Sequence, residues 1–415
     1  MDDRAPLDVN RPSRVAGKFG RDVTILFAAR AARGFGDGFA VIILPAYLST
    51  LGFDPIVIGI VATASLVGSA LFTLAIGYLA PHYDLRNLLV AGALLMVATG
   101  IAFPAFESLA FILAVSFIGT VNPSAGDIGL LVPVEQSMLA REVPDHERTR
   151  TFARYSLVGA LANACGALAA AIPEFLTDYG WGRIGAFAAM FYLYAALGVI
   201  STALYRRLPH VHADAKQAST PLGPSRGIVY KLAALFSLDS FAGGFAVQSL
   251  LALWLFDRYG LSLAMASVFF FWSSVLTAFS YPVAAWVSRR IGLINTMVFT
   301  HIPSSVCLIL AAFAPNLATT LGLLLVRSAL SQMDVPTRTS YVMAVVTPAE
   351  RTAAASVTAV PRSLASAISP GFAGLLMATS FSGLPFVVCG VLKIAYDVGL
   401  LALFRHLKPS EERAP

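Results

Sequence analysis

The chain has 415 residues, of which 57% are hydrophobic and only 13% are charged, and its mean hydropathy is +0.74. A soluble globular protein carries about 25% charged residues, so the composition excludes a soluble globular enzyme, a disordered protein and a disulfide scaffold. The net charge of +6 and the pI of about 9.3 raise the question of nucleic acid binding, which the placement of the charges decides below.

Apolar runs separated by turn signals predict twelve membrane-spanning helices, because a span needs roughly 20 apolar residues. In chain order they cover 23–50, 55–80, 86–105, 108–140, 150–173, 183–205, 229–256, 262–288, 293–313, 317–346, 351–378 and 383–405. Residues 1–22 are expected to form an N-terminal tail without a cleaved signal peptide. The remaining predicted units are a six-helix bundle over 23–205, a linker over 206–228, a second bundle over 229–405 and a tail over 406–415.

The Lys and Arg residues lie almost entirely on one side of these spans. With the N-terminus inside, 20 of the 29 Lys and Arg residues fall on the inner side, seven fall within spans, and only Arg183 and Arg258 fall outside. Cytoplasmic loops of membrane proteins are rich in Lys and Arg. The pattern predicts a multi-pass protein of the plasma (inner) membrane with both termini and the linker in the cytoplasm. Topology therefore accounts for the basic pI, and no nucleic acid partner is expected.

An internal repeat divides the chain into two similar halves. Gly38-Phe-Ala-Val recurs as Gly244-Phe-Ala-Val at an offset of 206 residues. Val132-Pro133, followed by Glu147-Arg-Thr, recurs as Val335-Pro336, followed by Glu350-Arg-Thr, at an offset of 203. Two matches in the same order at nearly the same offset indicate two six-helix units.

This organisation resembles the major facilitator superfamily of secondary transporters over essentially the whole chain. The loop from Gly77 to Arg86 resembles the superfamily signature after helix 2, although Pro81 and Asp84 replace its Asp and second Gly. The equivalent loop after helix 8 keeps Arg289, Arg290 and Gly292 and also lacks the Asp. A fragment like the antiporter signature occurs at Ser369-Pro-Gly in helix 11 instead of helix 5. The resemblance implies an all-α fold of two pseudo-symmetric six-helix bundles.

Charged residues within the spans are the candidate functional residues, because burying a charge at the bilayer centre costs at least about 2.5–3.5 kcal/mol. Most of them lie on helices 1, 4, 7 and 10, which line the central cavity in the superfamily that the chain resembles. Pro123 and Gly126 are expected to interrupt helix 4 near mid-membrane, as at transporter binding sites. The residues predicted to bind substrate or carry protons are Arg30, Arg33, Asp37, Asp127, Asp239, Gln248, Arg327, Gln332, Asp334 and Arg362.

Two sets of residues with opposite charges occupy equivalent places in the two halves. The repeat offsets align Arg33 with Asp239 and Glu135 with Arg338. Glu135 and Arg338 are therefore predicted to form a gating ion pair across the two halves when the inner side closes. Lys393 and Asp397 are four residues apart and are expected to pair with each other. His301 is expected to be a buried, hydrogen-bonded core residue.

The predicted function is secondary active transport of a small molecule by alternating access. Buried carboxylates without an ATP-binding motif favour coupling to protons, and we expect a monomer with no cofactor and no metal ion. Efflux of cationic or amphipathic compounds and transport of organic or inorganic anions by the buried arginines both stay open. A polytopic membrane enzyme is a remote alternative without a recognisable catalytic motif, and a channel is disfavoured because the charges form no repeated ring.

The predicted topology can be tested with single cysteines introduced at Ser219, Thr50 or Ser382 in a variant without the native cysteines. An impermeant thiol reagent applied to intact cells should label the cysteines at Thr50 and Ser382 and not the one at Ser219, which lies in the linker. Labelling at Ser219 alone would reverse the orientation.

Overall fold

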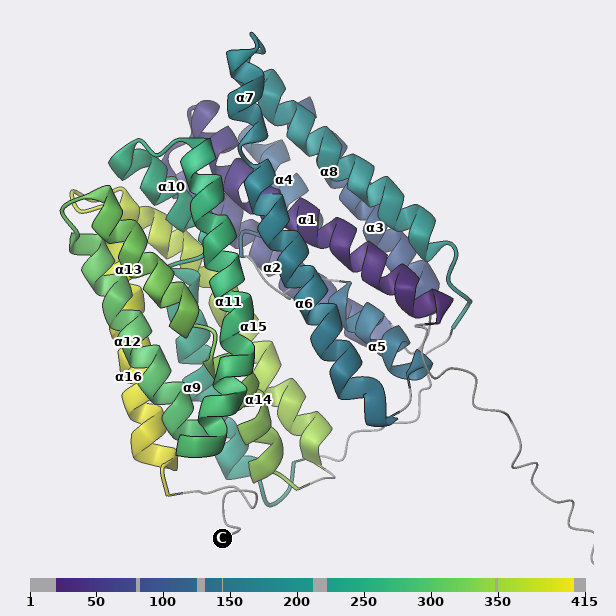
Figure 1. Ribbon diagram of the computed structural model, residues 1–415, viewed down its shortest axis with the longest axis vertical. Coiled ribbons are helices and arrows are strands. Elements are labelled where there is room, and N and C mark those ends of the chain that lie inside the picture. The colour runs from purple at the N-terminus through teal and green to yellow at the C-terminus, as the bar shows by residue number, and fades with distance from the viewer. Residues whose placement is uncertain are drawn as a thin grey trace, which may run out of the picture.

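The computed structural model describes residues 20–79, 83–124, 131–143, 145–211, 222–347 and 350–406. Their fold is α-helical, as predicted, with one short 3-10 helix (Figure 1). The elements are α1 (Arg21–Thr50), α2 (Pro55–Leu79), α3 (Leu85–Ala102), η1 (Phe103–Ala105), α4 (Leu109–Ile118), α5 (Val132–Glu142), α6 (Asp145–Ala169), α7 (Ile172–Asp178), α8 (Arg183–Tyr205), α9 (Arg226–Gly244), α10 (Gln248–Tyr259), α11 (Leu263–Ile291), α12 (Leu293–Phe313), α13 (Leu317–Leu330), α14 (Asp334–Val345), α15 (Arg351–Met377) and α16 (Leu384–Phe404).

These helices correspond to the twelve predicted spans, four of which are divided in two. The predicted break in the fourth span is present, because α4 ends at Ile118 and α5 begins at Val132. The predicted site residue Asp127, between Ile118 and Val132 in sequence, lies outside the described residues. The fifth, seventh and tenth spans are also divided, into α6 and α7, α9 and α10, and α13 and α14. Pro133 and Pro173 stand in the first turns of α5 and α7, where proline restarts a helix without losing a hydrogen bond.

Eight segments of the described chain are long and apolar enough to cross a membrane. The spans outside this set are α1, α4 with α5, α13 with α14, and α15. Three of these contain the charges Arg33, Glu135 and Arg338. Asp239 and Asp397 are also buried, but they lie on spans within the set. Buried charges therefore occur in both kinds of span.

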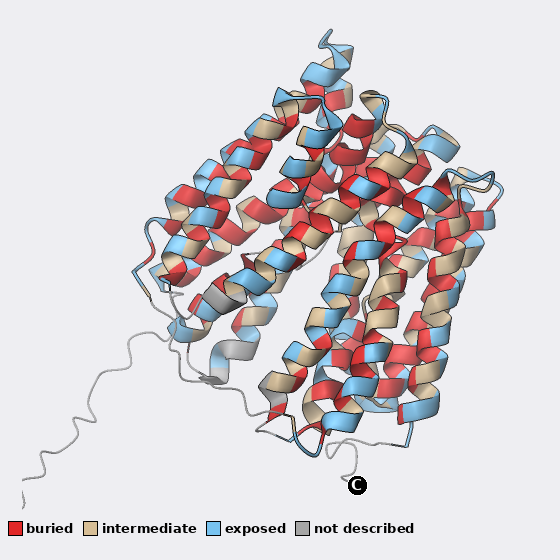
Figure 2. Ribbon diagram, turned by 180° about the vertical axis from the view of Figure 1, so that it is seen from behind, coloured by how far each residue is buried: buried red, intermediate tan, exposed pale blue. Residues whose placement is uncertain are grey.

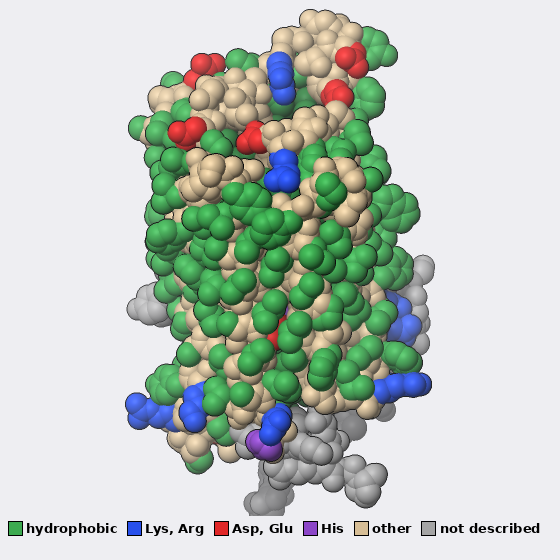
Figure 3. Space-filling view, turned by 90° about the vertical axis from the view of Figure 1, so that its left-hand side faces the viewer, with side chains coloured by type: hydrophobic (Ala, Val, Ile, Leu, Met, Phe, Trp, Pro, Cys, Tyr) green, Lys and Arg blue, Asp and Glu red, His purple; other side chains and the backbone are tan. Residues whose placement is uncertain are grey.

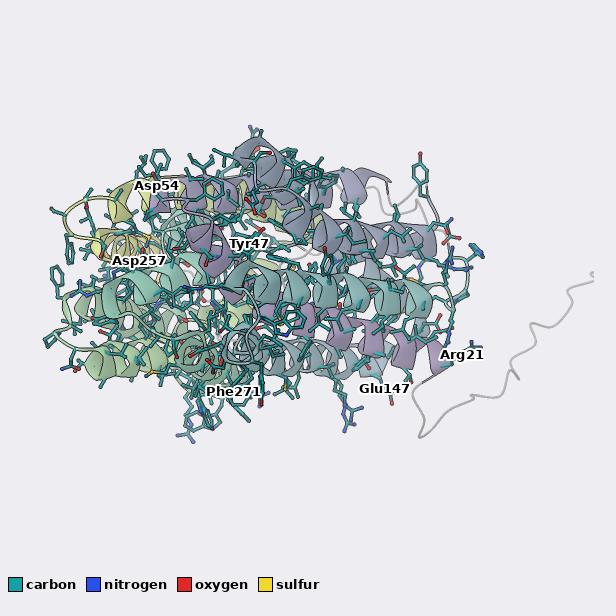
Figure 4. All side chains as sticks on the ribbon, turned by 90° about the horizontal axis from the view of Figure 1, so that it is seen from above. Arg21, Tyr47, Asp54, Glu147, Asp257 and Phe271 are labelled. Carbon is teal, nitrogen blue, oxygen red and sulfur yellow. The ribbon has the colours of Figure 1, made fainter. Side chains whose placement is uncertain are left out.

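The surface has the charge pattern of a membrane protein. A hydrophobic band surrounds the middle of the molecule, with Lys and Arg below it and most acidic residues above it on the face in view (Figure 3). We call the end at which α1 and α9 begin the terminal end, and the opposite end, at which α1 finishes, the far end. Helix-end residues at the far end include Asp54, Glu107, Glu174, Asp178 and Asp257. Asp54 and Asp257 lie on the side of the molecule opposite Arg21 (Figure 4).

Helices α1–α8 lie mainly on one side of the molecule and α9–α16 on the other, and we call these two groups the first half and the second half (Figure 1). Helix α1 packs on α6 and α8, and in the second half α9 packs on α15 and α16. Buried residues line the inward faces of these helices (Figure 2). The α1–α6 contact requires Gly38, because a Cβ there would overlap the backbone carbonyl of Asn163.

The two halves contact each other mainly toward the far end. At that end the amide of Gly371 on α15 donates to Thr63 Oγ1 on α2 over 2.8 Å. At the terminal end, the extensive contacts of α5 and α14 are all within their own halves. The ribbons of the two halves accordingly separate toward the terminal end (Figure 2). This arrangement has one end closed and the other end parted.

Each flank of the linker is fastened to a different half. His210 Nδ1 lies 2.6 Å from Asp84 Oδ2, next to a backbone bond from Leu85 N to Val211 O. Partial burial acts to raise the pKa of Asp84, but the hydrogen bonds from His210 and the Arg86 amide lower it overall.

On the other flank, Glu350 accepts hydrogen bonds from Thr347, Ser225 and the amide of Gly223. These bonds lower the pKa of Glu350 from 4.5 to about 2. A lowered pKa in the folded state means that the contact stabilises the fold above the ordinary pKa and is lost as the pH falls toward 2.

Gly38→Ala should destabilise the protein by about 1–3 kcal/mol, because the added methyl group forces α1 away from α6. Thermal unfolding of the detergent-solubilised protein measures this. Gly322→Ala on α13 is the matched control, since a Cβ there meets nothing within 4 Å. Equal melting temperatures for the two variants would contradict the close approach of α1 and α6.

Candidate functional site

A buried ion pair joins α1 to α5 in the first half. Arg33 Nη2 donates to Glu135 Oε2, and Arg33 Nε donates to the hydroxyl of Tyr205 over 3.0 Å. Tyr205 in turn donates to Glu135 Oε1 over 2.6 Å, and Tyr155 donates to Oε2. Glu135 is 0% exposed. The carboxylate therefore has a cation and two hydroxyl donors, which is what a buried charge needs in order to be tolerated.

The break in the fourth span places Glu135 where this pair can form. Because α5 begins at Val132, Glu135 lies in its first turn, where the helix dipole favours a negative charge. Asp334 occupies the first turn of α14 in the same way. Starting a helix inside the bundle thus gives each half a favourable place for a carboxylate.

The second half contains an ion pair with the opposite arrangement of charges. Arg338 Nη2 on α14 lies 2.9 Å from Asp239 Oδ2 on α9 and also donates to Asp334, one turn earlier on its own helix. Lys393 Nζ on α16 donates to Asp239 Oδ1 over 2.7 Å. Asp239 and Asp334 are 5% and 2% exposed. Asp239 is therefore held between two cations from two different helices.

His301 connects this ion pair to a third carboxylate. His301 Nδ1 lies 3.0 Å from both oxygens of Asp397, and Nε2 lies 3.2 Å from Lys393 Nζ. Nε2 is also 3.8 Å from Asp239 Oδ1. A neutral imidazole with its proton on Nδ1 fits these contacts, donating to Asp397 and accepting from Lys393. We call Asp239, His301, Asp334, Arg338, Lys393 and Asp397 the second-half cluster.

These contacts correct one of the predicted pairings. Lys393 pairs with Asp239 instead of Asp397, which pairs with His301. In this structure, whose terminal end is parted, Glu135 and Arg338 each pair within their own half. Their pairing with each other when the inner side closes stays a prediction. The expectation that His301 is a buried, hydrogen-bonded residue is confirmed.

Asp37 lines a small cavity in the first half. The cavity has a volume of about 40 Å³, enough for a water molecule, and its polar lining includes Arg33, Thr120, Asn122 and Tyr194. The Tyr194 hydroxyl lies 3.4 Å from Asp37 Oδ1 and 2.9 Å from Thr120 Oγ1. Among the described residues, Asp37 forms no salt bridge, which distinguishes it from Glu135, Asp239 and Asp334.

Three of the predicted arginines lie outside the two ion pairs. The Arg30 guanidinium lies 5.3 Å from the centre of the Tyr155 ring and against Gly159 on α6. Arg362 Nε on α15 donates to Ser240 Oγ over 3.2 Å. Arg327 lies on α13 and accepts a hydrogen bond at its backbone carbonyl from Ser304.

The two predicted glutamines both stand at helix breaks. Gln248 begins α10, and its buried Nε2 has no hydrogen-bond partner among the described residues. Gln332 lies between α13 and α14. In the part of the chain that the structure describes, no group of His, Cys, Asp and Glu residues could hold a metal ion.

Comparisons with known proteins agree with this architecture. The sequence profile of the Major Facilitator Superfamily matches residues 26–326 and 233–415. An uncharacterized membrane protein of Saccharomyces cerevisiae is 23% identical over 422 residues, covering 92% of this chain and 94% of the yeast protein.

The solved structures that resemble this one include several transporters. The inward-open xylose transporter XylE of E. coli has a TM-score of 0.72 at 13% identity, covering 95% of this chain and 98% of XylE. The nucleoside transporter NupG has a TM-score of 0.70 at 16% identity, covering 92% and 99%. A bacterial homologue of the lysosomal transporter Spinster, in an inward-facing state, has a TM-score of 0.67 at 14% identity, covering 93% and 96%.

Arg33→Met should destabilise the protein by about 3–5 kcal/mol, because it leaves the Glu135 carboxylate buried without a cation. Adding Glu135→Gln should restore most of that loss, since the amide oxygen still accepts from the tyrosine hydroxyls. Chemical unfolding of the four proteins of this double-mutant cycle measures the coupling. Arg207→Met, at an exposed position, is the control. Additive effects of the two changes would exclude a direct pair.

Proposed function

The chain belongs to the Major Facilitator Superfamily and is a membrane transporter instead of an enzyme, and we propose that it moves a small molecule in exchange for or together with protons through the second-half cluster. The observation that carries this proposal is His301, which bridges Asp397 and the Lys393–Asp239 pair inside the bundle. A histidine that is hydrogen-bonded to a buried carboxylate forms a pair that can share a proton and pass it on.

The charges of the cluster support this role. With His301 neutral, three carboxylates face the two cations Arg338 and Lys393, so the ion-paired set is one positive charge short. One proton, held by His301 or Asp397, neutralises it. Arg362 on α15, which contacts Ser240 next to Asp239 in sequence, adds a third cation. The set that includes Arg362 is neutral without this proton and carries one positive charge with it. A substrate that disturbs this balance would therefore change how tightly the proton is held.

Protonation would act on the contacts between four helices. Asp239, His301, Arg338 and Asp397 come from α9, α12, α14 and α16. A proton on His301 would compete with Lys393 for its place beside Asp239, because both would then be cations. The proton would thereby bias the packing of the second half, which is how a bound ion can shift an equilibrium between two access states.

We infer that this conformation is open toward the cytoplasm. The halves touch at the far end and part at the terminal end, and the Lys and Arg asymmetry favours cytoplasmic termini. The likeness to the inward-open state of XylE supports the same inference. The proposed setting is a monomer in the plasma (inner) membrane.

The leading proposal for the substrate is a cationic or amphipathic compound, exported in exchange for protons. Asp37 supports it, because this carboxylate lines a cavity and has a tyrosine hydroxyl as its hydrogen-bond partner. The alternative is an organic or inorganic anion. Arg362 supports that alternative, because its Nε contacts a serine and it forms no ion pair among the described residues. The two proposals differ in which of these two residues is indispensable.

The variants Asp397→Asn and His301→Gln should each lower pH-gradient-driven uptake into liposomes about tenfold or more. A loss of about 1.4 kcal/mol of coupling free energy already gives a tenfold change. Substrate exchange without a gradient should persist in both variants. Both replacements keep the side-chain shape and remove a proton site. Asp257→Asn at the exposed far end is the matched control. If both variants retain full gradient-driven uptake, protons are not coupled through this cluster.

A further inference from the structure

At the far end, a residue of the first half caps a helix of the second half. The backbone N–H of Ala264, the second residue of α11, donates to Glu174 Oε2 over 2.7 Å. Glu174 lies on α7, which continues the fifth span of the first half. This hydrogen bond therefore crosses the boundary between the two halves.

The local chemistry makes this contact a favourable one. The first N–H groups of a helix have no partner within the helix and carry its positive dipole end. Ser262 Oγ satisfies one of them by accepting from Met265 N over 3.2 Å. The Glu174 carboxylate satisfies another, and hydrogen bonds to a charged acceptor are about twice as strong as neutral ones. The start of α11 is thus completed by a side chain from the other half.

The surroundings of Glu174 keep the contact reversible. Glu174 is half-buried and borders an open recess of about 700 Å³, which both halves line. Trp181 and Arg183 line the recess from the first half, and Asp257 and Ser262 from the second. Water in the recess can replace either partner when the halves separate. The bond can therefore favour one state without preventing the other.

We propose that Glu174 is the residue that holds the far end closed, through the amino-terminal end of α11. The inference rests on the proposed alternating access between two states, and it assigns a role on the opposite end from the predicted Glu135 and Arg338 gate. When the far end opens, α7 and α11 separate, and Glu174 loses the Ala264 N–H. Removing the carboxylate consequently favours the state in which the far end is open.

Spin labels at Glu107 and Phe313 report this opening. Both residues are exposed at the far end, one in each half, and the labels go into a variant without Cys165, Cys307 and Cys389. Glu174→Ala should increase the ratio of the long to the short inter-label distance about tenfold. Glu174→Gln keeps a neutral acceptor and should increase it only about threefold. Asp257→Ala removes an acid from the same recess without touching α11 and should leave the ratio unchanged.

The outcomes separate this proposal from the proposed transport cycle. In one outcome, the parent protein shows two distances whose ratio responds to pH, but Glu174→Ala leaves that ratio unchanged. This outcome overturns the role of Glu174 and leaves alternating access in place. A parent protein and variants that all show one fixed distance overturn both. A graded increase from the parent protein through Glu174→Gln to Glu174→Ala, with the Asp257→Ala control unchanged, supports the proposal.

Discussion

The requirement that a charge buried in a membrane protein be paired determines much of this structure. Each half meets it with an ion pair between its first span and its divided fourth span. Arg33 pairs with Glu135 in the first half, and Asp239 pairs with Arg338 in the second. The repeat aligns Arg33 with Asp239 and Glu135 with Arg338, so the same interaction is present twice with its charges exchanged. A charge exchange of this kind preserves the pairing while it changes what surrounds the pair.

The surroundings of the two pairs explain why their roles should differ. Glu135 accepts hydrogen bonds from Arg33 and from two tyrosine hydroxyls, which fill three of the roughly four acceptor positions of a carboxylate. Asp239, by contrast, shares Arg338 with Asp334 and stands beside His301. A carboxylate whose partners are themselves shared changes its environment when one of them titrates. The first pair therefore suits a fixed structural role, and the second suits proton coupling.

Hydropathy and helix-end signals predicted the twelve spans, the break in the fourth and most span ends to within a few residues. They could not predict which buried charges meet, because that depends on how each helix is rotated about its own axis. The Lys393–Asp397 spacing suggested a pair on one helix, but the nearer partners are Asp239 and His301 on neighbouring helices. The alignment of Glu135 with Arg338 reflects the symmetry of the halves, and in this structure each residue has its ion-pair partner within its own half. The repeat does agree with the observed contacts, because Glu135 and Arg338 each pair with a residue on the first span of their own half.

The distribution of these contacts determines what must change during transport. The strong ion pairs lie within a half, so each half can move as a unit without separating buried charges. Contacts between the halves are of a weaker kind, such as the Gly371 amide to Thr63 and the Ser249 amide to the carbonyl of Pro123. Gly59 and Gly374 let α2 and α15 approach closely, because a Cβ at Gly374 would lie 2.5 Å from the carbonyl oxygen of Pro55. Small residues and neutral hydrogen bonds can separate at modest cost. The contact between Glu174 and α11 differs from these neutral contacts because its acceptor is a charged carboxylate. A change to this contact should therefore have a larger effect on the equilibrium between the two states.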